Sequence, residues 1–144
     1  MKVKSVLVLL IFTLFSINTY SQKKITWKEL TKVYHNEIYA DKSDDKKAIS
    51  LKDVEGKKIT VRGYFLDLGA DSMWYMLSRF PFENCFFCTG VGPETVIELG
   101  AFQNKKSKFK TDDIVTVTGT LFLRKEEGEY FYTLENCTVT FSET

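Results

Sequence analysis

The stretch Ile59-Thr60-Val61-Arg62-Gly63-Tyr64-Phe65-Leu66 decides the fold. Its β-branched and aromatic residues alternate roughly, which is typical of a β-strand, and a glycine inside a strand favours a bulge or sharp bend. The pattern returns at Val115-Thr116-Val117-Thr118-Gly119-Thr120-Leu121-Phe122, where Gly119 takes the place of Gly63. A small closed barrel requires strands that bend in this way. We therefore expect both strands in one barrel, with Val61, Val117 and Leu121 buried.

Three further segments are predicted strands, and they lie at 73–80, 94–99 and 130–141. A hairpin turn at Glu126-Glu127-Gly128-Glu129 leads into the last of them. Five strands with glycine bends predict a mainly β protein, a small OB-like, five-stranded, partly closed barrel with one N-terminal helix. A β-sandwich is the alternative.

The N-terminal helix is indicated by Ile25-Thr26-Trp27-Lys28-Glu29-Leu30. Thr26 and Glu29 have the spacing of a capping box, and Ile25 and Leu30 occupy the positions of a hydrophobic staple. Apolar residues then recur at helical spacing through Tyr34 and Ile38, which predicts a helix over 27–38 that lies on the barrel. We expect residues 22–50 to hold this helix and a charged linker, and residues 51–144 to form the barrel.

The first 21 residues have the order of a secretory signal peptide. Basic Met1-Lys2-Val3-Lys4 precedes an apolar run at 6–15 and small or polar residues at 16–21, with cleavage expected after Ser21. The apolar run is too short to span a bilayer. Of the 20 basic residues, Lys2 and Lys4 leave with the signal, so 18 basic residues face 19 acidic ones, a net charge of −1. A near-neutral protein is not drawn to nucleic acid or anionic lipid.

The unusual chemistry of the chain lies in Cys85-Phe86-Phe87-Cys88-Thr89-Gly90-Val91-Gly92-Pro93-Glu94. We expect Gly90, Gly92, Pro93 and Glu94 to shape this loop. A c-type haem site is excluded because Thr89, not histidine, follows the second cysteine. A redox-active pair needs a stabilised thiolate, which apolar neighbours and helix-breaking glycines disfavour.

Two interpretations of the cysteine loop remain open. Export places the cysteines in an oxidising compartment, so Cys85 and Cys88 are candidates for a short disulfide or buried thiol pair. They are also candidates for half of a zinc site, because Cys-x-x-Cys is a common pair of zinc ligands. Cys137 and His35 are the weaker metal candidates. We expect Cys137 to point into the core from the last strand.

The order of Trp27-x-x-Leu30, the segment 51–56, Val61-Arg62-Gly63-Tyr64 and a cysteine segment resembles a known group. It is similar to a family of exported bacterial proteins of unknown function, thought to be OB-like. In that family a cysteine is followed by histidine and a proline run, whereas this chain has Thr89 and then Gly92-Pro93-Glu94. The resemblance therefore does not imply, for this chain, a metal site based on the family's Cys-His pair.

These observations favour a binding or accessory module of the periplasm, or a secreted one, whose ligand is a small molecule, a metal such as zinc, or an envelope protein. A thiol–disulfide redox protein is the alternative. The chain shows no Ser-His-Asp set and no phosphate-cradling glycine loop, which disfavours an enzyme. Single-strand nucleic acid binding through Tyr64, Trp74 or Tyr132 is a third hypothesis, disfavoured by the charge and by the presence of only three arginines.

The signal peptide generates a direct prediction. We expect the protein isolated from the periplasm or medium to begin at Gln22, because Thr19 and Ser21 fit the small positions before a cleavage site. Intact-mass spectrometry checks this. Full-length protein retained in the inner membrane would contradict it.

Overall fold

The computed structural model describes residues 22–39, 49–69, 74–84, 90–101 and 109–143. Its regular elements are β1 (Lys23–Lys24), α2 (Trp27–Ile38), β2 (Lys58–Asp67), β3 (Tyr75–Ser78), β4 (Val96–Leu99), β5 (Ile114–Glu126) and β6 (Glu129–Phe141). Short 3-10 turns occur at Leu51–Asp53, Phe82–Asn84 and Pro93–Thr95. Over these ranges no helix has the length and apolar character needed to cross a membrane.

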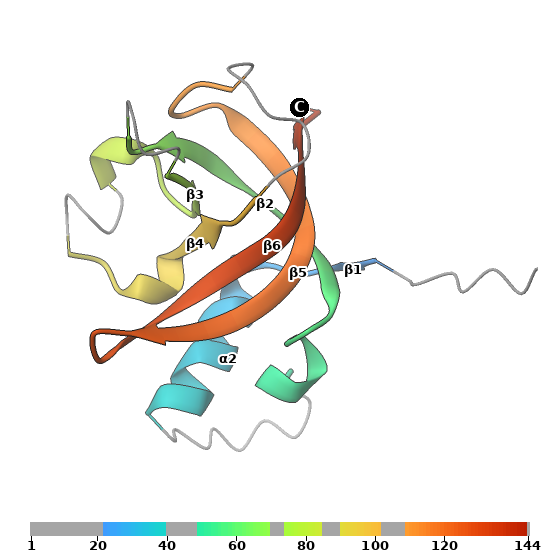
Figure 1. The fold of residues 1–144 in the computed structure, drawn as a ribbon, viewed down its shortest axis with the longest axis vertical. Helices are drawn as coiled ribbons and strands as arrows, with labels where there is room; N and C mark the ends of the chain where they lie inside the picture. Colours follow the sequence, from blue (N-terminus) through green and yellow to red (C-terminus); the bar gives the residue numbers. More distant parts are fainter. Residues whose placement is uncertain (1–21, 40–48, 70–73, 85–89, 102–108, 144) are drawn as a thin grey trace, which may run out of the picture.

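The strands form one sheet that closes on itself. Its order is β1-β2-β3-β4-β6-β5, and β2 also pairs with β5, so five strands make a barrel and β1 adds a short parallel edge to β2. Within the barrel only the β4–β6 pair is parallel. Figure 1 shows β2, β5 and β6 curving around the barrel axis. This arrangement confirms the OB-like barrel and excludes the β-sandwich alternative.

The two glycine-containing stretches are the strands that close the barrel. β2 and β5 pair antiparallel, with Val61 opposite Val117. Both valines and Leu121 are buried in the main core, as expected. The closure therefore depends on the segments whose repeated pattern first indicated a barrel.

Gly63 is required by a close backbone contact. A Cβ atom at this position would lie 2.5 Å from the carbonyl oxygen of Ser78 on β3 and 3.1 Å from the Leu77 side chain. Real Cβ atoms do not approach a backbone oxygen so closely. The missing side chain therefore lets β3 approach β2, which pairs with it from Tyr64 to Asp67.

Gly119 lies opposite a β-bulge in β6. From Thr118 to Thr120 the pairing advances two residues on β5 but three on β6, and Asn136 takes up the extra residue with a left-handed φ of 52°. Asparagine tolerates this conformation better than most residues. A Cβ on Gly119 would lie 3.0 Å from the Glu135 carbonyl oxygen and 3.1 Å from Cys137 Sγ. Glycine thus makes room for the bulge.

The helix α2 packs on the barrel through the predicted apolar stripe. The structure confirms its bounds and its capping box, in which the Glu29 amide donates to Thr26 Oγ1 and the Thr26 amide to Glu29 Oε2. Leu30 and Tyr34 are buried in the same core as the strands, as is Val33, which the stripe had not included. Figure 1 shows α2 below one end of the barrel.

Several strands differ from their predicted bounds, and β5 in particular runs to Glu126 instead of ending at residue 122. β4 begins at Val96 instead of residue 94, because Pro93–Thr95 forms a 3-10 turn and proline has no backbone N–H for a sheet. Of the strand predicted at 73–80, the structure assigns Tyr75–Ser78 to β3. The edge strand β1 was not expected, since two exposed lysines carry no strand pattern.

The contact at Gly63 generates a stability prediction. Gly63→Val should lower the free energy of unfolding by about 2 to 3 kcal/mol, because the side chain forces β2 and β3 apart. Urea denaturation measures this. Arg62→Val, at an exposed neighbour on the same strand, is the control and should change stability by less than about 0.5 kcal/mol. Equal effects of both variants would contradict the close contact.

Cys137 generates a second prediction. Its side chain is fully buried, its Sγ donates to the Leu134 carbonyl oxygen at 2.9 Å, and burial, with a smaller effect of Glu135, raises the thiol pKa to about 12. Cys137→Ser should cost about 1 to 3 kcal/mol through burial of a hydroxyl in a site shaped for sulfur. In the native wild type, mass-spectrometric mapping should find Cys137 unlabelled by iodoacetamide until urea unfolds the chain. Rapid native labelling would contradict its burial.

Candidate functional site

The site predicted from the sequence lies between β3 and β4. The structure describes this connection on both sides of its cysteines, as the turn Phe82–Asn84 and from Gly90 to the turn Pro93–Thr95. Cys85 and Cys88 themselves lie outside the described residues, so their pairing or ligation stays a prediction. Gly90 has a φ of +67°, which glycine adopts without strain.

The turn that follows the cysteines sets the position of Glu94. The Gly92 carbonyl oxygen accepts from the Thr95 amide at 3.1 Å and from Thr95 Oγ1 at 2.8 Å. Pro93 occupies the first position of the turn, where no backbone N–H is needed. The Glu94 carboxylate folds back over Gly92 into the space that a Cβ there would fill. Gly92, Pro93 and Thr95 thus shape the loop around one carboxylate.

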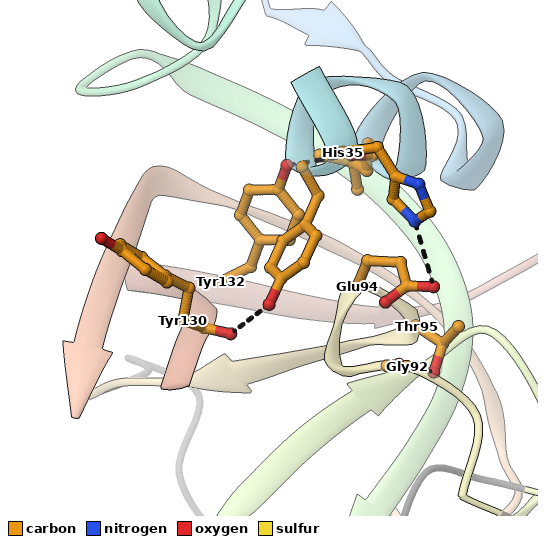
Figure 2. Close-up of polar contacts among 8 residues, drawn as sticks. His35, Gly92, Glu94, Thr95, Tyr130 and Tyr132 are labelled. Carbon is orange, nitrogen blue, oxygen red and sulfur yellow. Dashed lines mark hydrogen bonds and ion pairs between the residues drawn. The ribbon is translucent and has the colours of Figure 1, made fainter. Parts of the chain in front are cut away.

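The Glu94 carboxylate contacts the imidazole of His35, which lies on α2 and is far from Glu94 in the sequence. Glu94 Oε1 lies 3.7 Å from His35 Nε2, and Figure 2 shows the imidazole reaching from α2 toward the carboxylate. The His35 side chain is 45% exposed and that of Glu94 16%. The imidazole side of the contact therefore faces solvent, and the carboxylate side is sheltered.

Two tyrosines hold α2 in the orientation that brings His35 against Glu94. Tyr132 of β6 is fully buried and donates its hydroxyl to the Leu30 carbonyl oxygen at 2.9 Å. Tyr34 donates to the Tyr130 carbonyl oxygen at 3.0 Å (Figure 2), and its ring packs edge-on against Tyr132 at 5.8 Å. Burial, followed by Tyr39 and Glu94, raises the Tyr34 pKa to about 12, and burial raises the Tyr132 pKa further. Both phenols therefore stay neutral donors.

The weaker metal candidates are not brought together. Cys137 is buried in the barrel and bonded to Leu134, whereas His35 contacts Glu94. In the part of the chain that the structure describes, no group of three or more His, Cys, Asp or Glu side chains could hold a metal ion. Tyr132 is fully buried, so it cannot act as the stacking platform that the disfavoured nucleic-acid hypothesis required.

The His35–Glu94 pair is what the sequence reasoning missed. Both residues were named separately, one as a metal candidate and the other as part of the loop, but no local pattern joins residues so far apart. The His35–Glu94 pair could act either as an ion pair or as two ligands of a metal ion. A protonated imidazole forms a charge-assisted contact with the carboxylate, whereas a neutral imidazole and a carboxylate are both zinc ligands.

The comparisons with known proteins bear on the fold. The structure resembles the crystal structure of a DUF3299 family protein from Pseudomonas aeruginosa PAO1, with a TM-score of 0.55 and 14% sequence identity over 86% of this chain and 98% of that one. No family model matches the sequence. No curated protein matches it either. This chain therefore shares its fold with a member of a bacterial family of unknown function.

Proposed function

We propose that this protein is an accessory binding module of the bacterial cell envelope, whose site is formed by the cysteine loop and the adjoining end of α2. The observation that carries the proposal is the His35–Glu94 contact at 3.7 Å. It joins a helix and a turn at the C-terminal edge of the loop that holds Cys85 and Cys88. His35 and Glu94, which the sequence analysis named for separate reasons, therefore lie against each other.

Zinc is the ligand that this donor set fits best. Two thiolates, an imidazole nitrogen and a carboxylate oxygen are all zinc donors, and four ligands complete a tetrahedral site. Zinc would be held by Cys85, Cys88, His35 and Glu94. A bound ion would then link the loop to α2.

The envelope location rests on the first 21 residues of the sequence, which have the order of a secretory signal. An OB-like barrel with a short helix is also a common scaffold for binding without chemistry. Export, zinc and a binding role therefore make one consistent hypothesis. A disulfide between Cys85 and Cys88 would instead make the loop a rigid part of a surface that binds another ligand.

Metal content of the purified mature protein tests the proposal. We expect about one equivalent of zinc per chain after dialysis, lost in the Cys85→Ser, Cys88→Ser double variant and bound more weakly in Glu94→Gln, which replaces a carboxylate ligand with a neutral amide. Zinc content is measured by elemental analysis, and affinity by competition with a chromogenic chelator. Circular dichroism should show the barrel intact in each variant.

The matched control is Cys137→Ser, which removes a cysteine outside the site and should retain zinc. Zinc lost from this variant as well would join all three cysteines in one metal centre. Absence of zinc, with two more free thiols after reduction than before, would leave a local disulfide and overturn the metal site. A double variant that fails to fold would show that the loop is structural.

A further inference from the structure

A concave surface lies between the start of β2, the edge strand β1 and the 3-10 turn Leu51–Asp53. It has a volume of about 970 Å³, and its lining includes Lys23, Lys57, Lys58, Asp53 and Thr120. We call it the lysine pocket. It shares none of its described lining residues with the proposed zinc site. Its volume lies within the range of sites for small molecules.

Strand pairing brings the three lysines together. The edge strand β1 runs along the start of β2 (Figure 1), with Lys23 opposite Ile59. Lys58, the preceding residue of β2, lies opposite Thr120 on the other side. Lys57 comes directly before this strand, and all three lysines are exposed. Positive charges from two distant parts of the sequence therefore line one cavity.

The lysines keep their charge available to a ligand. Across the described residues, none of the three takes part in a direct ion pair with a carboxylate. Lys57 Nζ donates to the Asp53 backbone carbonyl oxygen at 3.0 Å. An ammonium group has three donors, so two remain on Lys57 for a ligand.

The carboxylate of the lining, Asp53, is held by Ser50. Asp53 Oδ2 accepts from the Ser50 amide at 2.9 Å and from Ser50 Oγ at 2.7 Å. These hydrogen bonds, and to a smaller extent the charges of Lys57 and Lys23, hold the pKa of Asp53 below its ordinary value. Glu29, which Lys23 also approaches, is bound in the capping box of α2 and does not line the pocket. Three ammonium groups and one carboxylate leave the described lining with a net charge of +2.

We propose that the lysine pocket binds a small molecule that carries phosphate groups. Lysine binds phosphate as a point charge, whereas planar recognition of a carboxylate favours arginine, and no arginine is among the described lining residues. The half-buried Thr120 adds a hydroxyl that can donate to a phosphate oxygen. The protein as a whole is nearly neutral, so an extended anionic surface gains little from the rest of the molecule. A small anion needs only the pocket.

A titration of the ¹⁵N-labelled mature protein with inorganic phosphate, at fixed ionic strength, tests the proposal by NMR. We expect saturable shifts that are largest for the amides of Gly56, Lys57 and Thr120. Lys23→Gln and Lys58→Gln should each weaken the affinity about two- to fivefold, the size of one exposed charge pair. Asp53→Asn keeps a side-chain oxygen for Ser50 but removes the negative charge, so it should strengthen binding by a similar factor. A gain in affinity would not reflect misfolding.

The matched control is Lys110→Gln, which removes the same charge from an exposed lysine beyond the opposite end of the β2–β5 pairing. Its affinity for phosphate should be unchanged. Equal weakening in this control, shifts spread evenly over the surface, or no effect of the three pocket variants would overturn the site. Sedimentation with phosphatidylglycerol vesicles without binding of free phosphate would overturn the small-molecule ligand and place the phosphate on a lipid.

Discussion

The pairing of β2 with β5 is the interaction on which the rest of the structure depends. It turns a sheet with two open edges into a closed barrel, and closure both encloses the core and removes edges at which strands of other chains could pair. The curvature needs two places where backbones approach closely. Gly63 provides one against Ser78, and Gly119 provides the other against the bulge at Asn136.

The closed barrel creates the surfaces that carry the proposed functions. Its end receives α2, which is held by hydrogen bonds from two tyrosines to backbone carbonyls. A helix fixed in this way presents His35 to Glu94 without depending on the pair itself.

Much of the fold was predictable because its signals are local. The capping box at Thr26 and Glu29 needs four residues, and the alternation of β2 and β5 is visible in each strand alone. The start of β4 was misplaced, since a short apolar run does not show where a proline turn ends. The site was predictable only in part. Sequence named Glu94 and His35, but nothing near either one indicates the other.

By itself, the sequence determined that the chain forms a small β-barrel with a capped helix, because alternation, glycine spacing and capping act over a few residues. It also showed that two cysteines, two phenylalanines and a Gly-x-Gly-Pro segment occur together at 85–93. Only the tertiary structure decided that His35 lies against Glu94, that Tyr132 is buried beneath α2, and that Lys23 shares a pocket with Lys58. These contacts join residues far apart in the chain. They follow from strand register and barrel closure, which bring together segments that no local pattern relates.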